Sequence, residues 1–252
     1  MESIKVMVTG DYACFTRPEM KVERVSYDVP TPGALEGMLK STYWKPSCRM
    51  VIDKIVVFNP INFINIRRNE VKTPVTLSKM KGQMVQARKA VADPFEAIKA
   101  DPCIYTSRER TQRSSLVLKN VKYGVEFHIE LTGLKNDREK KIGNPLKKHY
   151  EIFTRRCKKG QSFRQPCLGC SEFPADMQLV DDFDLSQVAP ENLGEKDLGF
   201  MLYKVRFKDH GHPIDDDWER NQYSNEADSV FYRPIMVDGV IDVAKYRKEQ
   251  LC

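Results

Sequence analysis

The chain has 252 residues, 41% of them hydrophobic and 30% charged, which fits a folded globular protein with a sizeable core and excludes a disordered or fibrous chain. The formal net charge of +6 is too small to identify a partner, but residues 108–164 are markedly basic, whereas acids collect in residues 181–228. No apolar run approaches the roughly 20 residues that span a bilayer, and the first residues lack a signal-peptide layout. We therefore expect a cytoplasmic protein without a membrane partner, whose basic middle region meets an anionic ligand.

The cysteines and histidines give little support to a metal site. Seven scattered cysteines in a chain of this length favour reduced thiols. Cys167 and Cys170 form one CxxC, and without a second CxxC or a nearby histidine pair we expect a structural loop, with zinc as the alternative. His210 and His212 indicate an exposed turn more readily than a ligand pair. Since P-loop, HExxH and GxGxxG motifs are also absent, the sequence predicts neither a metal nor a cofactor.

The first elements are a strand and a helix. Residues 3–10 alternate apolar and polar side chains, which predicts a half-buried strand. A helix is then expected from Thr31, a residue type that caps helices, and Pro32, which suits the first helical position. Apolar residues at helical spacing continue until Pro46 ends the run. Tyr43 falls on the last turn of this helix, where a tyrosine is usually a packing residue with its hydroxyl near water.

An extended region and an insertion follow. Residues 51–68 are extended and apolar, with an interruption at Pro60, and they end on Arg67 and Arg68. Residues 69–107 are less regular, with a polar helix over 79–92 and two Asp-Pro turns. We interpret residues 69–107 as an insertion.

The clearest strand lies in the basic middle of the chain. From Val121 to Leu131 every odd residue is apolar, which predicts a half-buried strand. The parity is reversed upstream, so a bulge or a strand start is expected near Lys119, with Lys119 and Asn120 at the break. The preceding segment carries Arg108, Arg110 and Arg113, and is either a phosphate-binding segment or a solvated loop.

A second helix is expected from Asn144 and Pro145 to Gly160, with a basic outer face that provides either solubility or RNA contacts. A loop and a short strand over residues 177–180 follow. The order β-α-β-β-α-β predicts an α+β fold with a ferredoxin-like, RRM-like domain over residues 1–180. Residues 199–208, 229–237 and 240–243 look like further strands, which predicts a small antiparallel β domain over residues 181–252.

Four segments resemble one known family and occur in its expected order. They are SYDVPTPGALEGMLKSTYWKP, LKNVKYGVEFHI, FTRRCKKGQSFRQPCLGCSEFPA and DLGFMLYKVRF. They are similar to the subtype I-C (Dvulg) CRISPR-associated Cas protein of family five, in the RAMP superfamily. The resemblance implies an RRM-like domain followed by a smaller β-rich domain. It also implies a metal-independent endoribonuclease that cuts the repeat hairpin of CRISPR precursor RNA and stays with the guide RNA in the type I-C surveillance complex, beside its backbone and large subunits.

The resemblance also implies site residues. Tyr43 matches the family's catalytic tyrosine, and Lys119 matches its catalytic lysine. Asn120 stands where a characterised member has histidine, and an amide can orient a group but cannot transfer a proton near neutral pH. The general base therefore stays open, and His128 lies about 30 Å further along the strand, at roughly 3.3 Å per residue.

The implied chemistry is attack of the ribose 2′-hydroxyl on the adjacent phosphate, giving a 2′,3′-cyclic phosphate and a 5′-hydroxyl. A lysine cation suits stabilisation of the phosphorane charge. We expect basic side chains to bind the RNA: Lys45, Arg67, Arg68, Arg108, Arg110, Arg113, Lys122, Arg155 and Arg156. The alternative function is a structural subunit that binds guide RNA without cutting it.

Overall fold

The computed structural model describes residues 3–20, 22–72, 76–92, 107, 109–132, 145–208 and 226–249. The chain divides into two compact units, one formed by Met1–Asn65 with Leu116–Cys252 and the other by Ile66–Ser115. The smaller unit largely coincides with the insertion expected from the sequence.

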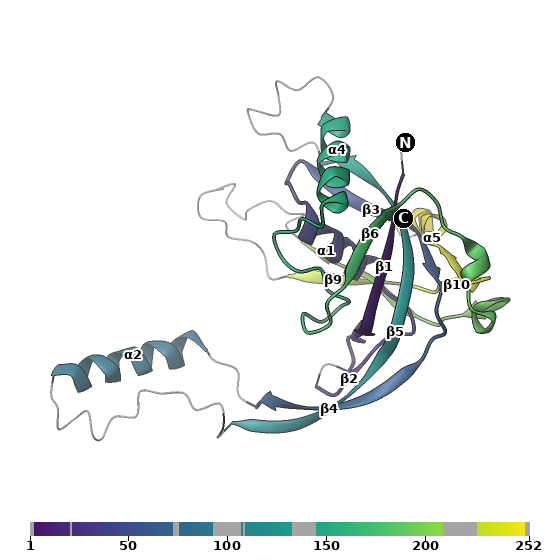
Figure 1. The fold of residues 1–252 in the computed structure, drawn as a ribbon. Coiled ribbons are helices and arrows are strands. Elements are labelled where there is room, and N and C mark those ends of the chain that lie inside the picture. The colour runs from purple at the N-terminus through teal and green to yellow at the C-terminus, as the bar shows by residue number, and fades with distance from the viewer. Residues whose placement is uncertain are drawn as a thin grey trace. The chain divides into compact units, whose positions relative to one another are not determined.

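The larger unit is built on an antiparallel sheet in which β1 and β3 both pair with β5, and β6 pairs with the outer edge of β1 (Figure 1). Two helices connect these strands in the order β1-α1-β3-β5-α4-β6, which confirms the predicted β-α-β-β-α-β order and the α+β class. The elements are β1 (Ile4–Ala13), α1 (Pro32–Thr42), β3 (Cys48–Val57), β5 (Arg110–Leu131), α4 (Pro145–Lys158) and β6 (Asp176–Val180).

Helix α1 begins as its sequence predicts but ends earlier, at Thr42, so Tyr43 does not lie on its last turn. The Thr31 hydroxyl accepts a hydrogen bond from the backbone N–H of Ala34 at 3.2 Å, and Pro32 occupies the first turn. Tyr43 follows as the C-cap residue, and its backbone is extended. Leu35 and Leu39 are buried, so α1 is held mainly by its apolar face.

The two faces of the sheet are covered differently. Phe127 of β5 packs edge-on against Phe153 of α4, with ring centroids 5.1 Å apart, so this face meets the helices. On the opposite face, a Cβ on Gly124 would lie 2.8 Å from the Phe183 ring. Phe183 and Val188 come from the segment after β6, and with Phe58 they form a second apolar cluster. The sheet is therefore buried on both sides near its centre.

Strands from the end of the chain extend the same sheet. β11 (Val240–Asp242) pairs with β3, and β10 (Ile235–Val237) lies between β11 and β7 (Glu195–Asp197). Asp238 and Gly239 join β10 to β11 with φ angles of 49° and 76°, which confirms the predicted hairpin turn. The separate domain over residues 181–252 stays a prediction.

The remaining elements are short. β8 (Met201–Phe207) and β9 (Ala227–Tyr232) form a two-stranded sheet, and α5 (Val243–Glu249) closes the described chain. Two 3₁₀ turns, η2 (Leu185–Gln187) and η3 (Pro190–Asn192), lie in the segment after β6, and β2 (Arg24–Val25) pairs with β5.

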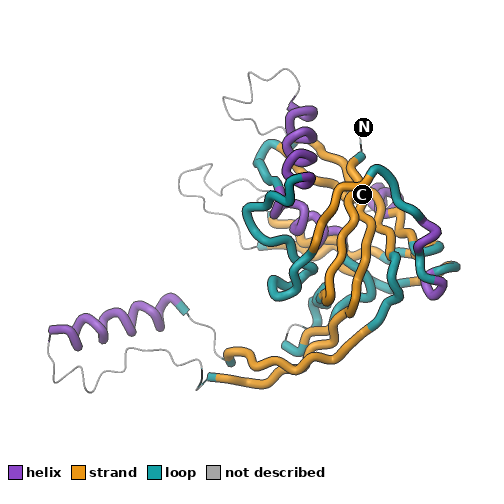
Figure 2. The backbone as a smooth tube through the Cα atoms, viewed as in Figure 1, coloured by secondary structure: helices purple, strands orange, loops and turns teal. Residues whose placement is uncertain are grey.

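The smaller unit contains the outer parts of β4 (Phe63–Val71) and β5, together with α2 (Leu77–Ala92), all drawn as strand and helix in Figure 2. The polar helix expected over residues 79–92 is confirmed as α2. The segment from Arg110 to Ser115, expected as a loop or a phosphate-binding segment, is part of β5. Among the described residues, no helix is long and apolar enough to cross a membrane.

Candidate active site

Lys119 and Asn120 lie at an irregular point of β5. Asn120 has a φ of 52°, in the left-handed region, and its carbonyl accepts a hydrogen bond from Asn59 Nδ2 at 2.8 Å. The backbone N–H of Lys119 donates to the carbonyl of Asn62 at 2.9 Å. The strand continues through this position, because Val121 pairs with Gly10 in β1 and Lys119 pairs with Tyr12. The break expected near Lys119 is therefore a local distortion, with both side chains exposed.

A cleft of about 540 Å³ opens beside Asn120. Asp11 lines this cleft and lies between Gly10 and Tyr12, directly across the β1–β5 pair from Asn120. Lys122 also lines it and donates from Nζ to Gln187 Oε1 at 2.8 Å. The cleft thus combines three carboxylates, those of Asp11, Glu172 and Asp176, with two amides and the Lys122 cation. The other lining residues are Thr9, Gly10, Tyr12, Asn59, Val121, Glu172, Phe173, Pro174 and Asp176.

Tyr43 is held in a buried hydrogen-bond chain. It is 2% exposed, and its hydroxyl lies 2.7 Å from Nδ1 of His149, which is 0% exposed. The other ring nitrogen of His149 lies 3.4 Å from Ser47 Oγ. The Arg156 guanidinium lies 5.4 Å from the Tyr43 ring centroid and donates to the carbonyl of Thr42 at 3.0 Å. In this arrangement the tyrosine is packed rather than presented to a ligand.

Sequence reasoning missed His149. A signal was present, since His149 precedes Phe153 by four residues and Phe153 precedes Cys157 by four, and all three are buried on one face of α4. The apolar pattern drew attention to Tyr150 instead, which is only half-buried.

The structure does not bring Tyr43 together with Lys119 and Asn120. Cys48, at the start of β3 and close in sequence to Tyr43, pairs with Leu131 at one end of β5. Lys119 lies twelve residues earlier on the same strand, roughly 40 Å away at about 3.3 Å per residue. The catalytic roles of Tyr43, Lys119 and Asn120 stay predictions, and a single site holding all three is not formed here.

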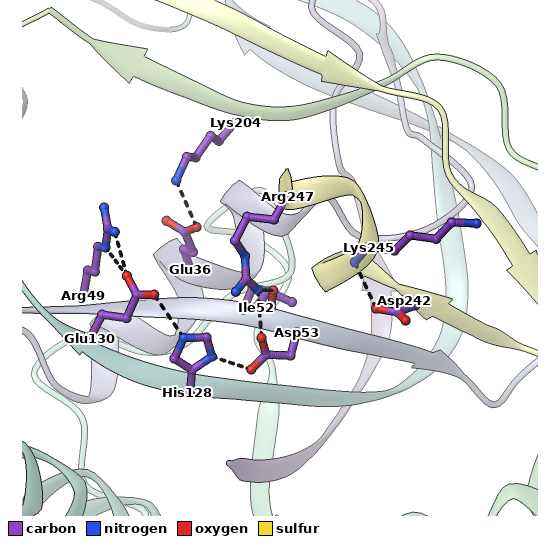
Figure 3. Close-up of polar contacts among 10 residues, drawn as sticks. All are labelled: Glu36, Arg49, Ile52, Asp53, His128, Glu130, Lys204, Asp242, Lys245 and Arg247. Carbon is purple, nitrogen blue, oxygen red and sulfur yellow. Dashed lines mark hydrogen bonds and ion pairs between the residues drawn. The ribbon is translucent and has the colours of Figure 1, made fainter. Parts of the chain in front are cut away.

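His128 cannot act as an unengaged base in this structure. Its Nδ1 lies 2.6 Å from Asp53 Oδ2, and its Nε2 lies 3.2 Å from Glu130 Oε1 (Figure 3). Arg247 of α5 donates to Asp53 Oδ1 at 2.8 Å, and Arg49 pairs with Glu130. Hydrogen bonds from Arg49 and His128 lower the pKa of the Glu130 carboxyl, although its partial burial opposes them. This network ties α5 to β3 and β5.

The residues predicted to bind RNA fall into groups. Arg67 and Arg110 are exposed on the smaller unit, whereas Arg68 and Arg113 both pair with Glu70, at 3.3 and 3.2 Å. On the larger unit, Lys45 and Arg155 are exposed, Lys122 lines the cleft, and Arg156 packs on Tyr43. Arg108 lies outside the described residues. RNA binding by these side chains stays a prediction.

The CxxC loop packs on the end of β1. The backbone N–H of Cys14 donates to the carbonyl of Leu168 at 3.0 Å, and the Arg24 guanidinium lies 2.9 Å from Cys170 Sγ. A hydrogen bond from Cys14, helped by the Arg24 charge, lowers the pKa of the Cys170 thiol to about 6. Within the described ranges, no group of three or more His, Cys, Asp or Glu side chains is placed to hold a metal ion. His210 and His212 lie outside those ranges.

Comparison with known proteins identifies relatives over nearly the whole chain. A family model described as CRISPR-associated protein (Cas_Cas5), of the Cas5d type, matches residues 3–244. A protein from Mannheimia succiniciproducens named CRISPR pre-crRNA endoribonuclease Cas5d is 42% identical over 98% of this chain and 97% of its own. A protein of the same name from Thermus thermophilus is 38% identical over 84% of this chain and 78% of its own.

A solved structure described as a CRISPR-associated protein has the same fold. It superposes with a TM-score of 0.59 at 21% identity, covering 96% of this chain and 91% of its own. At this identity the likeness supports the fold alone.

Proposed function

Because the chain belongs to the Cas5d family of CRISPR-associated proteins, we propose that it is an endoribonuclease that cuts CRISPR precursor RNA. The observation that carries this proposal is the 42% identity, over nearly the full length of both chains, to a protein named as such an enzyme. We further propose that the chain keeps the mature guide RNA and joins the other type I-C subunits, as its resemblance to the family implies.

We propose that the RNA is cut in the cleft beside Asn120 and that this reaction uses no metal ion. The ribose 2′-oxygen would attack the adjacent phosphorus, the bond from phosphorus to the 5′-oxygen would break, and that oxygen would take a proton from water. The products are a 2′,3′-cyclic phosphate and a 5′-hydroxyl. The exposed Lys119 cation next to the cleft supports stabilisation of the charge that builds on the phosphorane oxygens.

Asp11 is our candidate for the base that removes the 2′-hydroxyl proton. Asn120 cannot accept that proton, and both ring nitrogens of His128 are bonded to carboxylates. The Asp11 carboxylate lies across the strand pair from Asn120 and lines the same cleft. Its side chain is exposed, so a substrate can reach it.

The reaction is tested with purified protein and repeat RNA in EDTA, followed by analysis of the product ends. We expect one specific cut, a cyclic phosphate on the upstream product and no cut when the ribose at that position is 2′-deoxy. Asp11→Asn should slow cleavage by about 10²-fold while RNA binding is kept. Cleavage of the deoxy substrate, or a requirement for magnesium, would refute the internal-attack mechanism.

A structural subunit is the alternative function, and two observations favour it. Tyr43 is buried far along the sheet from Lys119, and asparagine occupies position 120. The same assay separates the two functions, since a structural subunit binds the repeat RNA but leaves it uncut under every metal condition.

A further inference from the structure

Two large aromatic side chains are exposed close to the end of α1. Trp44 is 53% exposed and Phe163 is 71% exposed, although neither lines the cleft beside Asn120. Burying such rings is favourable, so an isolated chain that leaves both in water forgoes a sizeable contribution to its stability. Exposed aromatic rings of this size indicate a surface that meets a ligand.

The backbone places these two residues in one neighbourhood. The N–H of Phe163 donates to the carbonyl of Ser41 at 3.0 Å, three residues before Trp44. Arg156, near the end of α4, donates to the carbonyl of Thr42. The loop after α4 is therefore fixed against the end of α1, and it carries Phe163 with it.

Cations surround the aromatic pair. Arg155 lies on α4 and Lys159 follows the last residue of this helix, four residues after Arg155, while Arg156 donates to the carbonyl of Thr42 in α1. Lys45 and Arg164 directly follow Trp44 and Phe163 in the sequence. Lys45, Arg155, Lys159 and Arg164 are all exposed, and none forms an ion pair with a carboxylate within the described part of the chain. Their charge is thus available to an anionic ligand.

We propose that Trp44 and Phe163 form a stacking surface for unpaired bases of an RNA strand, whose phosphates the surrounding cations neutralise. An RNA strand supplies both an aromatic face and a negative charge at each nucleotide, which matches alternating rings and cations. Bases inside a duplex are already stacked, so the surface selects single-stranded RNA. This surface lies at the Leu131 end of the sheet, away from the cleft beside Asn120. Trp44 is four residues before Cys48, and Cys48 pairs with Leu131 at that end of β5.

This inference rests on the proposed RNA-binding function and adds a second contact outside the cleft. A strand that flanks the repeat hairpin would occupy this surface. Because each stacked base contributes about 1 to 3 kcal/mol, losing one ring weakens binding by roughly 5- to 150-fold.

The test uses the fluorescence of Trp44. The chain contains two tryptophans, so Trp218→Phe leaves Trp44 as the sole reporter. In this background, a ten-nucleotide oligoadenylate should quench Trp44 with saturation, whereas a blunt RNA duplex at the same phosphate concentration should not. Phe163→Ala should weaken oligoadenylate binding by roughly 5- to 150-fold. Phe207→Ala, which removes a ring exposed to 51% on β8, is the matched control and should leave binding unchanged.

The cations are tested by the salt dependence of binding. Replacing Arg155 with alanine should reduce the slope of log affinity against log salt by about 0.7, the value for one phosphate contact on a single strand. Unchanged oligoadenylate affinity in Phe163→Ala, or equal quenching by the duplex, would overturn the stacking surface. A hairpin RNA without flanking nucleotides contacts the cleft but not this surface. If the unmodified protein does not cut that RNA, the result counts against the proposed function and not against the stacking surface.

Discussion

The buried hydrogen bond between Tyr43 and His149 allows a sharp test of what the tyrosine does. Tyr43→Phe keeps the ring and removes only the hydroxyl, which takes from His149 Nδ1 a partner 2.7 Å away in a side chain with no exposure. A buried polar group that loses its partner costs about 1 to 3 kcal/mol. For a chain of this size, that lowers Tm by roughly 2 to 12 °C, at about 2 to 4 °C per kcal/mol.

A double-mutant cycle isolates the bond. His149→Leu alone should also destabilise the protein, because the Tyr43 hydroxyl then loses its hydrogen bond to His149 Nδ1. The double variant should lose less than the sum of the two single losses, by about 0.5 to 3 kcal/mol. Urea unfolding followed by circular dichroism measures all four proteins. Tyr12→Phe is the control, since its ring is only half-buried and it should change stability by no more than about 0.5 kcal/mol.

Comparing the stability and the RNA cleavage of the Tyr43→Phe variant shows whether the Tyr43 hydroxyl acts on the RNA. We expect Tyr43→Phe to lower stability, and the catalytic role that the family resemblance implies for Tyr43 predicts slower cleavage below the unfolding temperature as well. A variant with unchanged stability and abolished cleavage would refute this reasoning, because the hydroxyl would then act on the RNA rather than on His149.

Four further predictions concern the strand irregularity and the CxxC loop. Gly169→Ala should destabilise the protein by about 3 kcal/mol or more in urea unfolding, because φ is +85° and a Cβ would lie 2.0 Å from the carbonyl oxygen of Cys14; normal stability would show that this close approach is absent. Asn120→Val should cost about 1 to 2 kcal/mol, since its φ of 52° disfavours a β-branched residue. Asn120→His should fold and keep or raise single-turnover cleavage, and much slower cleavage would give Asn120 a positioning role of its own. Alkylation of Cys170 by iodoacetamide should have its midpoint at a lower pH than that of an ordinary thiol, because Cys14 and the Arg24 charge lower the pKa of the Cys170 thiol. Arg24→Gln should move that midpoint to higher pH, and mass spectrometry of the labelled peptide reads it out.

Much of the fold was predictable because local signals and burial agree. Thr31 and Pro32 set the start of α1, and Asp238 with Gly239 set the last hairpin, since each of these positions requires a particular residue type. The alternation from Val121 to Leu131 identified the central strand. The continuation of β5 back to Arg110 was not predicted, because its stability comes from pairing with β4, a partner distant in the sequence.

The site was less predictable for the same reason. Tyr43 and Lys119 were each recognised by resemblance, but their separation depends on the antiparallel register that places Cys48 opposite Leu131. His149 and Asp11 gave weak local signals, because a histidine on a helix face and an aspartate after a glycine are common. Only the packing of α4 on α1 and the pairing of β1 with β5 show where these side chains lie.

Lys119 gives the most direct test of the central claim, that RNA is cut without metal at the cleft beside Asn120. The measurement is the single-turnover rate of repeat RNA cleavage in EDTA, for the unmodified protein and for Lys119→Ala, with RNA affinity measured in parallel. We predict a specific cut by the unmodified protein and a rate about 10²-fold lower in the variant, with affinity little changed, because the cation acts mainly on the transition state. Equal rates in the two proteins, or no cut by either in EDTA, would contradict the account.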